Sequence, residues 1–351
     1  MGSKIMTKTN TPMPPERLLE LDDVQVHFPL REGLVKAVNG VSYHVNKGEV
    51  LGIVGESGSG KSITARAIMR LLPKRAEAAG GTIRFRPRTG EEFELSALDR
   101  NSRAIRQVRG QHIGMVFQEP MTALSPVHTI GMQIMRTVQL HKGLSRADAR
   151  ARAIDLLAKV QMPRPSEMVD AFPHQLSGGM RQRAMIALAI CCDPSLLIAD
   201  EPTTALDVTT EAQILELLKQ LQAEMGMAII FITHNFGVIA DIADRVSVMY
   251  LGRMVETATV DDIFYAPKHP YTKALLRSIP RLGVDQGRRL PTIPGMVPDP
   301  FSVPSGCAFN PRCTYAQPGL CDVTTPPEKH FGNQMSRCHV AEKLAEEHAH
   351  V

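Results

Sequence analysis

The residues Gly55-Glu56-Ser57-Gly58-Ser59-Gly60-Lys61-Ser62 match the pattern G-x-x-x-x-G-K-S of a phosphate-binding loop. An apolar run at 50–54 precedes the loop as a buried strand would, and a helix-permissive segment at 63–72 follows it. Glycines let backbone N–H groups turn toward phosphate oxygens, and the helix start adds the positive end of its dipole. We therefore expect a nucleoside triphosphate site in which Lys61 reaches the β- and γ-phosphates and Ser62 binds Mg²⁺.

The composition is that of an ordinary globular protein. The 351 residues suffice for two or three domains, and 43% of them are apolar and 22% charged. The net charge of +4 is too small to indicate nucleic-acid binding by itself. No apolar run approaches the roughly 18 residues needed to span a bilayer, and the polar residues 1–16, expected to be disordered, lack a signal-peptide core. We expect a cytosolic protein that reaches a membrane through a partner.

Apolar runs alternate with helical patterns along most of the chain. Residues 196–199 and 228–232 resemble buried strands, and a helix is predicted between them at 210–225. This alternation predicts an α/β fold with a mostly parallel sheet. β-branched runs within 17–60 predict further strands, and helical patterning from about 121 to 192 predicts a helical insertion.

Polar residues with catalytic chemistry follow two of the predicted strands. Asp200 and Glu201 come directly after residues 196–199, and His234 follows residues 228–232. A carboxylate at the end of a buried strand completes the Mg²⁺ shell in phosphate-loop ATPases, which is the role expected of Asp200. Glu201 can accept a proton from the attacking water, and His234 can contact the γ-phosphate at the ligand-binding edge of the sheet. The alternative is a solvated acidic turn and an ordinary strand-end histidine.

Leu176-Ser177-Gly178-Gly179-Met180 forms a second glycine-bearing helix start. Ser177 can cap a helix that runs to about residue 192, and the two glycines expose backbone N–H groups to an anion. One triphosphate does not need two separate phosphate sites in one subunit. The motif therefore indicates a dimer in which each subunit completes the nucleotide site of the other, unless it is only the cap of a buried helix.

In order and spacing these motifs resemble those of the ABC-type ATPases over about residues 17–265. The resemblance implies a P-loop NTPase of RecA-like fold, with a mostly parallel sheet, an antiparallel β subdomain, and a helical signature subdomain inserted at about 120–193. It assigns ATP contacts to Gly55, Glu56, Ser57, Gly58, Ser59, Gly60, Lys61, Ser62, Ile63 and Gln118. It assigns Mg²⁺ to Ser62, Gln118 and Asp200, catalysis to Glu201 and His234, and the ATP of the partner to Ser177, Gly178, Gly179 and Met180. It also places Asp207 in the D-loop, residues 205–207.

Two positions depart from the usual family pattern. Residues 176–180 correspond to the signature motif of the family, and Met180 ends it where glutamine is commoner; this change leaves the backbone donors unaffected. Asn235 follows His234 at a position where aspartate is frequent. The family also stacks an aromatic ring on adenine upstream of the phosphate loop. Phe28 is the nearest clear aromatic, whereas Val35 lies closer to the expected place, so this contact stays unassigned.

After about residue 266 the sequence becomes rich in proline, which argues against a regular helical or sheet domain there. We expect a small, loop-rich extension at 266–351. Its start, residues 269–276, resembles the extension of the dipeptide and oligopeptide importer ATPases, most of all the D-type ATPases of dipeptide permeases. The resemblance implies a peripheral protein on the cytoplasmic face of the cell membrane. It would form a heterodimer with a homologous ATPase beneath two membrane permease subunits, and an extracytoplasmic solute-binding protein would deliver the solute.

The extension also carries four cysteines in the spacing C-x5-C-x7-C-x16-C, namely Cys307, Cys313, Cys321 and Cys338. In a cytosolic protein such a group suggests a metal site before it suggests disulfides. Structural zinc sites draw their ligands in close pairs, and no such pair is present. Irregularly spaced thiolates on loops suit a [4Fe–4S] cluster, as in some peptide-permease ATPases that this extension resembles. Zinc and the absence of any metal remain alternatives.

The leading interpretation is ATP hydrolysis that powers the uptake of dipeptides or oligopeptides. Relatives import nickel chelates, opines and oligosaccharides, so the same machinery with another solute is an alternative. An ABC ATPase that acts on nucleic acid is another alternative. DNA-condensing relatives carry coiled coils between the phosphate loop and the strand that ends in the Mg²⁺-binding aspartate, whereas no heptad run separates Lys61 from Asp200 here. A nucleotide kinase would leave residues 176–180 without a purpose. We expect no nucleic-acid partner.

Overall fold

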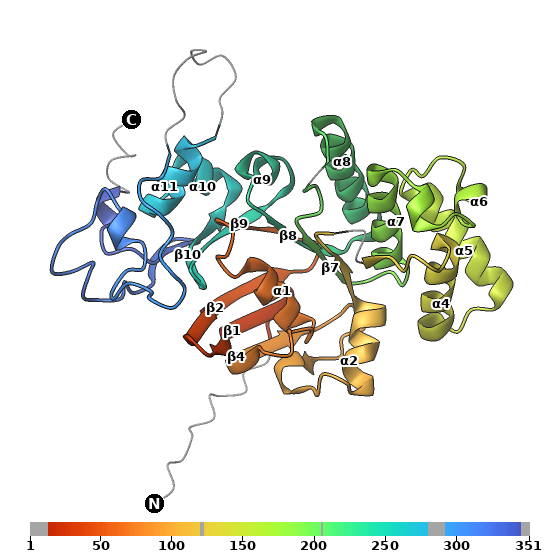
Figure 1. The fold of residues 1–351 in the computed structure, drawn as a ribbon, viewed down its shortest axis with the longest axis horizontal. Coiled ribbons are helices and arrows are strands. Elements are labelled where there is room, and N and C mark those ends of the chain that lie inside the picture. Colours follow the sequence, from red (N-terminus) through yellow and green to blue (C-terminus); the bar gives the residue numbers. More distant parts are fainter. Residues whose placement is uncertain (1–12, 120–122, 205, 280–291, 345–351) are drawn as a thin grey trace, which may run out of the picture.

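The computed structural model describes residues 13–119, 123–204, 206–279 and 292–344 (Figure 1). Most of the N-terminal segment expected to be disordered, residues 1–16, and the polar end of the extension lie outside these ranges, as does Ala205 of the predicted D-loop. Two sheets organise the described residues, one of eight strands and one of four.

The eight-stranded sheet has the order β11-β12-β10-β9-β3-β8-β7-β6. Its strands are β3 (Val50–Val54), β6 (Ile113–Val116), β7 (Leu196–Asp200), β8 (Ala228–Thr233), β9 (Arg245–Tyr250), β10 (Arg253–Thr259), β11 (Lys329–Phe331) and β12 (Gln334–Ser336). The pairs from β9 through β6 are parallel, whereas β10, β12 and β11 join antiparallel at one edge. β3 is buried along its whole length because both faces of the sheet are covered.

The smaller sheet is antiparallel and has the order β2-β1-β4-β5. Its strands are β1 (Arg17–Leu30), β2 (Gly33–Asn46), β4 (Glu77–Phe85) and β5 (Phe93–Glu94). The sequence predicted short strands here, but β1 and β2 each run for 14 residues, interrupted by shifts in register rather than by turns. Such irregularities let a long pair twist over the core beneath it.

The helices are α1 (Lys61–Ile68), α2 (Arg103–Gln107), α4 (Ile130–Lys142), α5 (Arg146–Lys159), α6 (Pro165–Met168), α7 (Gly178–Ile190), α8 (Val208–Met225), α9 (Phe236–Ile242), α10 (Val260–Tyr265) and α11 (Pro270–Arg277). α8 ends at Gly226 in the left-handed conformation, as predicted. α1 ends at Ile68, four residues short of the prediction, because Arg70 adopts a positive φ.

Two hydrophobic clusters pack against opposite faces of the main sheet. One joins β3, through Leu51 and Ile53, to α1 and the antiparallel sheet; the other joins β3, through Val50 and Val54, to the helices α4 to α9. α4, α5, α6 and α7 form a helical lobe at one end of the molecule, and the segment after α10 forms a lobe at the other (Figure 1). We call the described residues 292–344 the tail lobe. The prolines do not keep it free of strands, since β11 and β12 extend the main sheet.

Candidate nucleotide-binding site

The phosphate loop joins β3 to α1 in a conformation that only glycine permits at two positions. Gly55 and Gly60 have φ values of 156° and 104°. A Cβ atom at Gly55 would lie 2.1 Å from the carbonyl oxygen of Met249, and one at Gly60 would lie 2.3 Å from that of Ala37. Because neighbouring backbone closes around the loop, these glycines leave its N–H groups as the surface that a phosphate meets.

Lys61 lies at the centre of this loop and folds back onto it. Its Nζ atom donates to the carbonyl oxygens of Gly55, at 2.7 Å, and Glu56, at 3.0 Å. Burial lowers the pKa of this ammonium, while the nearby carboxylates of Glu201 and Asp200 oppose the effect. The ammonium is thus held beside the loop, at the place where phosphate oxygens would replace its carbonyl partners.

Ser62 and Asp200 come together although 138 residues separate them. The Ser62 hydroxyl donates to Oδ1 of Asp200 at 2.8 Å, and Asp200 is buried at the end of β7. Burial raises the pKa of the Asp200 carboxyl, and the hydrogen bond from Ser62 opposes this. A hydroxyl and a carboxylate side by side are the hard oxygen ligands that Mg²⁺ prefers, so these residues fit the ion.

Glu201 is the centre of a group drawn from three strand ends. Its carboxylate accepts from Nε2 of Gln118 at 3.0 Å and from the hydroxyl of Thr204 at 2.9 Å, and it lies 3.5 Å from Nδ1 of His234. Glu201 has a φ of 48°, a conformation that costs a non-glycine residue free energy. The carboxylate is thus placed between Gln118 and His234, where it could accept a proton.

The signature residues lie elsewhere. Ser177 caps α7 by accepting from the backbone N–H of Met180 at 3.3 Å, and Gly178 is exposed. α7 belongs to the helical lobe, well away from α1 and the phosphate loop of the same chain (Figure 1). Asp207 caps α8, accepting from the backbone N–H of Thr210 at 3.0 Å. The structure therefore brings together the phosphate loop, Gln118, Asp200, Glu201 and His234, but not Ser177–Met180 or Asp207.

The tail lobe and α11 touch the phosphate loop directly, which the sequence did not reveal. The backbone N–H of Glu56 donates to the hydroxyl of Tyr271 at 2.9 Å. The guanidinium of Arg312 donates to both carboxylate oxygens of Glu56, at 2.7 and 3.0 Å. No local sequence pattern predicts contact between Arg312 and Glu56, which are 256 residues apart in the chain. The proline-rich composition of the segment even argues against an ordered contact.

The four cysteines of the tail lobe line one small cavity together with His269 and Tyr315. All four thiols are free, and burial raises the pKa of Cys313 to about 11 and that of Cys338 to about 12. Across the described residues, however, no group of three or more His, Cys, Asp or Glu side chains has an arrangement that could hold a metal ion. The cluster predicted from the spacing is therefore not supported by the side-chain arrangement.

Comparison with known proteins gives two family matches. The description "ABC transporter" matches residues 38–204, and "Oligopeptide/dipeptide transporter, C-terminal region" matches residues 255–321. A putative peptide import ATP-binding protein of Brucella melitensis is 50% identical over 331 residues, which cover 92% of this chain and 96% of that protein. The chain belongs to the ABC transporter family. It is an ABC-type ATPase with the C-terminal region of the oligopeptide and dipeptide branch, as its motifs predicted.

Further relatives agree with this ABC ATPase assignment. A probable peptide ABC transporter ATP-binding protein of Sinorhizobium fredii is 50% identical over 310 residues, 88% of this chain and 90% of that protein. Among solved structures, one similar to this chain is a dimeric post-hydrolysis state of the ATP-binding cassette MJ0796 bound to ADP and Pi. Its sequence identity is 27% and its TM-score 0.61, and the match covers 69% of this chain and 99% of that chain. The structure of cbiO1 from Clostridium perfringens, part of the ABC transporter complex cbiONQ, has 26% identity and a TM-score of 0.59, covering 71% of this chain and 91% of that chain.

The fold class predicted from the sequence, an α/β P-loop NTPase, is thereby confirmed. As an ABC importer subunit, the protein works with membrane permease partners. Within the described ranges, none of its own helices is long and apolar enough to cross a membrane.

Proposed function

We propose that this ATPase powers the import of short peptides. Two relatives at 50% identity are named as peptide import or peptide transporter ATP-binding proteins, and the tail region matches the oligopeptide and dipeptide branch. The separation of α7 from the phosphate loop supports a mechanism that uses two subunits, because a nucleotide site divided in this way is completed only by a second subunit (Figure 1). ATP-driven closure of two such subunits would move the attached membrane subunits.

Each site residue has a role that its contacts support. Residues 55–63 bind the phosphates, with Lys61 as the cation that meets the β- and γ-phosphates. Ser62 and Asp200, joined at 2.8 Å, hold Mg²⁺ together with Gln118. Glu201 takes the proton of the attacking water, and His234, 3.5 Å from it, contacts the γ-phosphate.

The second subunit is a homologous ATPase, giving a heterodimer in which Ser177, Gly178, Gly179 and Met180 contact the ATP of the partner. The exposure of Ser177 and Gly178 at the start of α7 supports this role. Asp207, at the start of α8, would lie in the same dimer contact. The dimeric state of the solved cassette MJ0796 is consistent with such pairing. The complex would sit on the cytoplasmic face of the membrane, with an extracytoplasmic solute-binding protein that delivers peptides.

The adenine contact also belongs to this proposal. Phe28 and Val35, the two candidates from the sequence, are directly opposite each other in the β1–β2 pair and so share one face of it. Both can therefore border one adenine, with the ring of Phe28 stacked on the base and Val35 beside it.

We also propose that Cys307, Cys313, Cys321 and Cys338 hold a [4Fe–4S] cluster, which would require the four side chains to draw closer around their shared cavity. Four thiols, the imidazoles of His269 and His339 and no carboxylate border that cavity among the described residues, and four thiols are the usual donor set of an iron–sulfur cluster. The cluster would supply a structural staple or a redox centre for the tail lobe.

Reconstitution with the partners tests the transport function. The chain, its sibling ATPase and the two membrane subunits would be co-purified in proteoliposomes with the solute-binding protein. We expect Mg–ATP to drive uptake of radiolabelled dipeptides and tripeptides. Uptake of a nickel chelate or an oligosaccharide instead of peptides would refute the peptide assignment while leaving the ATPase assignment intact. High-affinity binding of duplex DNA with no membrane partner recovered would refute both.

A further inference from the structure

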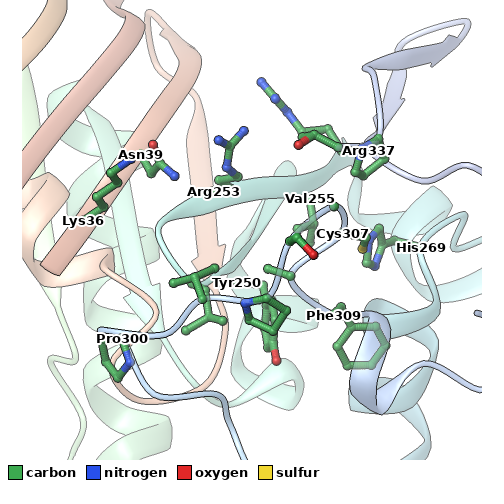
Figure 2. A pocket seen from close by; sticks show the side chains of 18 of the residues that line it. Lys36, Asn39, Tyr250, Arg253, Val255, His269, Pro300, Cys307, Phe309 and Arg337 are labelled. Atoms are coloured by element: carbon green, nitrogen blue, oxygen red, sulfur yellow. The ribbon is translucent and has the colours of Figure 1, made fainter. Parts of the chain in front are cut away.

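A cavity of about 350 Å³ lies where the tail lobe meets the nucleotide domain (Figure 2). Its walls come from β2, from the turn between β9 and β10, from the N-terminus of α11, and from the tail-lobe residues 300–309. The volume is in the range of sites that bind metabolite-sized molecules. No residue of the phosphate loop lines it. Leu34 and Lys36 face it, so the intervening Val35 and its partner Phe28 face the other side of the strand pair.

Three cationic side chains gather at this cavity: Lys36 from β2, Arg253 from β10 and Arg337 after β12. Figure 2 shows Arg253 and Arg337 extending in the same direction on one side, with Lys36 and Asn39 nearby. Among the described lining residues there is no aspartate or glutamate to balance them. The cavity therefore carries a concentrated positive charge.

Nearby carboxylates neutralise the positive charges of these three residues only in part. Arg337 pairs through Nη2 with Glu328, yet its Nε–H is buried without an acceptor among the described residues. Within the same ranges, neither Arg253 nor Lys36 has a hydrogen-bonded or ion-paired partner, and Asp23 acts on Arg253 only at a distance. Burial, and then the charge of Arg337, lower the pKa of Arg253. Holding partly desolvated like charges together costs free energy that a bound anion would recover.

The rest of the lining suits an organic molecule. Val255, Phe301 and Val303 supply apolar surface. His269, which is 1% exposed, adds a neutral donor: burial lowers its pKa to about 3, and its Nδ1 accepts from the backbone N–H of Tyr271 at 3.1 Å. The proton of the neutral ring is then on Nε2, beside the backbone of Arg337.

We propose that this cavity binds a small organic anion. Its carboxylate or phosphate group lies between Arg253 and Arg337, within reach of Lys36, and its apolar part packs against Phe301 and Val303. Such charge-assisted hydrogen bonds from guanidinium groups are the strong ones in proteins. Because the three cations come from β2, β10 and the tail lobe, the ligand fastens the lobe to the nucleotide domain. The site is separate from that of ATP and does not depend on the proposed cargo.

Calorimetric titration of the full chain, with saturating Mg–ADP to occupy the phosphate loop, tests this site. The probes are phenyl phosphate, 3-phenylpropanoate and the neutral 3-phenylpropanol. We expect at least one anion to bind at least tenfold more tightly than the alcohol, and the tighter of the two identifies the head group. Inorganic phosphate should bind at least tenfold more weakly than phenyl phosphate, because it lacks the apolar part. Equal binding of anion and alcohol, or no binding of any probe at millimolar concentration, overturns the proposal.

Variants locate the binding. Arg253→Gln and Arg337→Gln should each raise the dissociation constant of the tighter probe at least tenfold and leave that of Mg–ADP unchanged. Arg150→Gln, which removes an exposed arginine paired with Asp170, should change neither. Without ligand, Arg253→Gln should keep or raise the melting temperature, since it relieves a repulsion. A lowered melting temperature would assign Arg253 a structural role instead, and unchanged probe affinity in both cavity variants would also refute the site.

Discussion

The guanidinium of Arg312 in the tail lobe donates two hydrogen bonds to the carboxylate of Glu56 in the phosphate loop, at 2.7 and 3.0 Å. The side chain of Arg312 is 4% exposed and stacks near the rings of Tyr250 and Phe309, and its Nε donates to the carbonyl of Pro294 at 3.1 Å. These contacts hold the guanidinium in position independently of its ion pair with Glu56. Because Cys313 is the next residue, the cysteine cavity is connected to the nucleotide site through one side chain.

Arg312→Gln should weaken nucleotide binding. Leaving the partly exposed Glu56 carboxylate without these hydrogen bonds should lower the free energy of unfolding by about 1–3 kcal/mol and loosen the loop around Glu56. A loss of about 1 kcal/mol in loop preorganisation would raise the dissociation constant of ATP about fivefold. Arg312→Lys should not restore binding, because lysine lacks the two-pronged donor geometry. Binding of a fluorescent ATP analogue measures this, and an unchanged dissociation constant would show that the contact does not shape the loop.

Glu201→Gln should abolish turnover while keeping ATP bound. A glutamine accepts no proton from water, so hydrolysis should slow by a factor of about 10²–10⁴. With ATP, the variant should remain associated with its ATPase partner on size-exclusion chromatography. Glu211→Gln is the matched control, because that carboxylate accepts from Thr203 at 2.7 Å and takes no part in the site. Wild-type turnover in Glu201→Gln would remove it as the base.

Phe28→Ala should weaken ATP binding about two- to thirteenfold, since a stacked ring contributes about 0.5–1.5 kcal/mol. Tripolyphosphate has no base to stack, so its affinity should be unchanged, and this separates stacking from any loss of folding. Val35→Ala, opposite Phe28, serves as the comparison and should have a smaller effect. Equal weakening of ATP and tripolyphosphate in Phe28→Ala would contradict the adenine contact.

Protein purified without oxygen should be brown and contain roughly four irons with acid-labile sulfide. Cys338→Ser should lose the iron and lower the melting temperature of the chain. Cys192→Ser should keep the iron, because Cys192 lies in the hydrophobic cluster of the nucleotide domain. The iron and zinc content and the absorption spectrum of the purified protein measure this. A colourless, zinc-loaded preparation would exclude the iron–sulfur cluster.

Glu256 should make stability fall as the pH rises. Burial raises its pKa from 4.5 to about 6, against the hydrogen bonds that it accepts from Lys268, Gln334 and His269. The native state therefore favours the protonated form. The associated stabilisation is complete below about pH 4.5 and is lost as the pH rises through about 6, a decline of about 2 kcal/mol. Urea unfolding between pH 4.5 and 7.5 should show this decline, and Glu256→Gln should lack it; parallel pH profiles would contradict the shift.

The sequence predicted well what depends on neighbours in the chain. The phosphate loop, the cap at Ser177 and the end of α8 at Gly226 follow from local backbone requirements that only certain residues meet. The meeting of Ser62 with Asp200 also followed, because parallel strands end at one edge of a sheet. The strands β11 and β12 were missed because three-residue strands carry almost no periodic signal.

By itself, the sequence determined that this chain is an ABC-type ATPase, because its motifs match those of the family in order and spacing. Only the tertiary structure decided how the extension relates to that site. Arg312 reaches Glu56, and Arg253 and Arg337 line one cavity, through packing between segments far apart in the chain. Such contacts arise from the closure of long loops, for which neighbouring residues give no periodic or local signal.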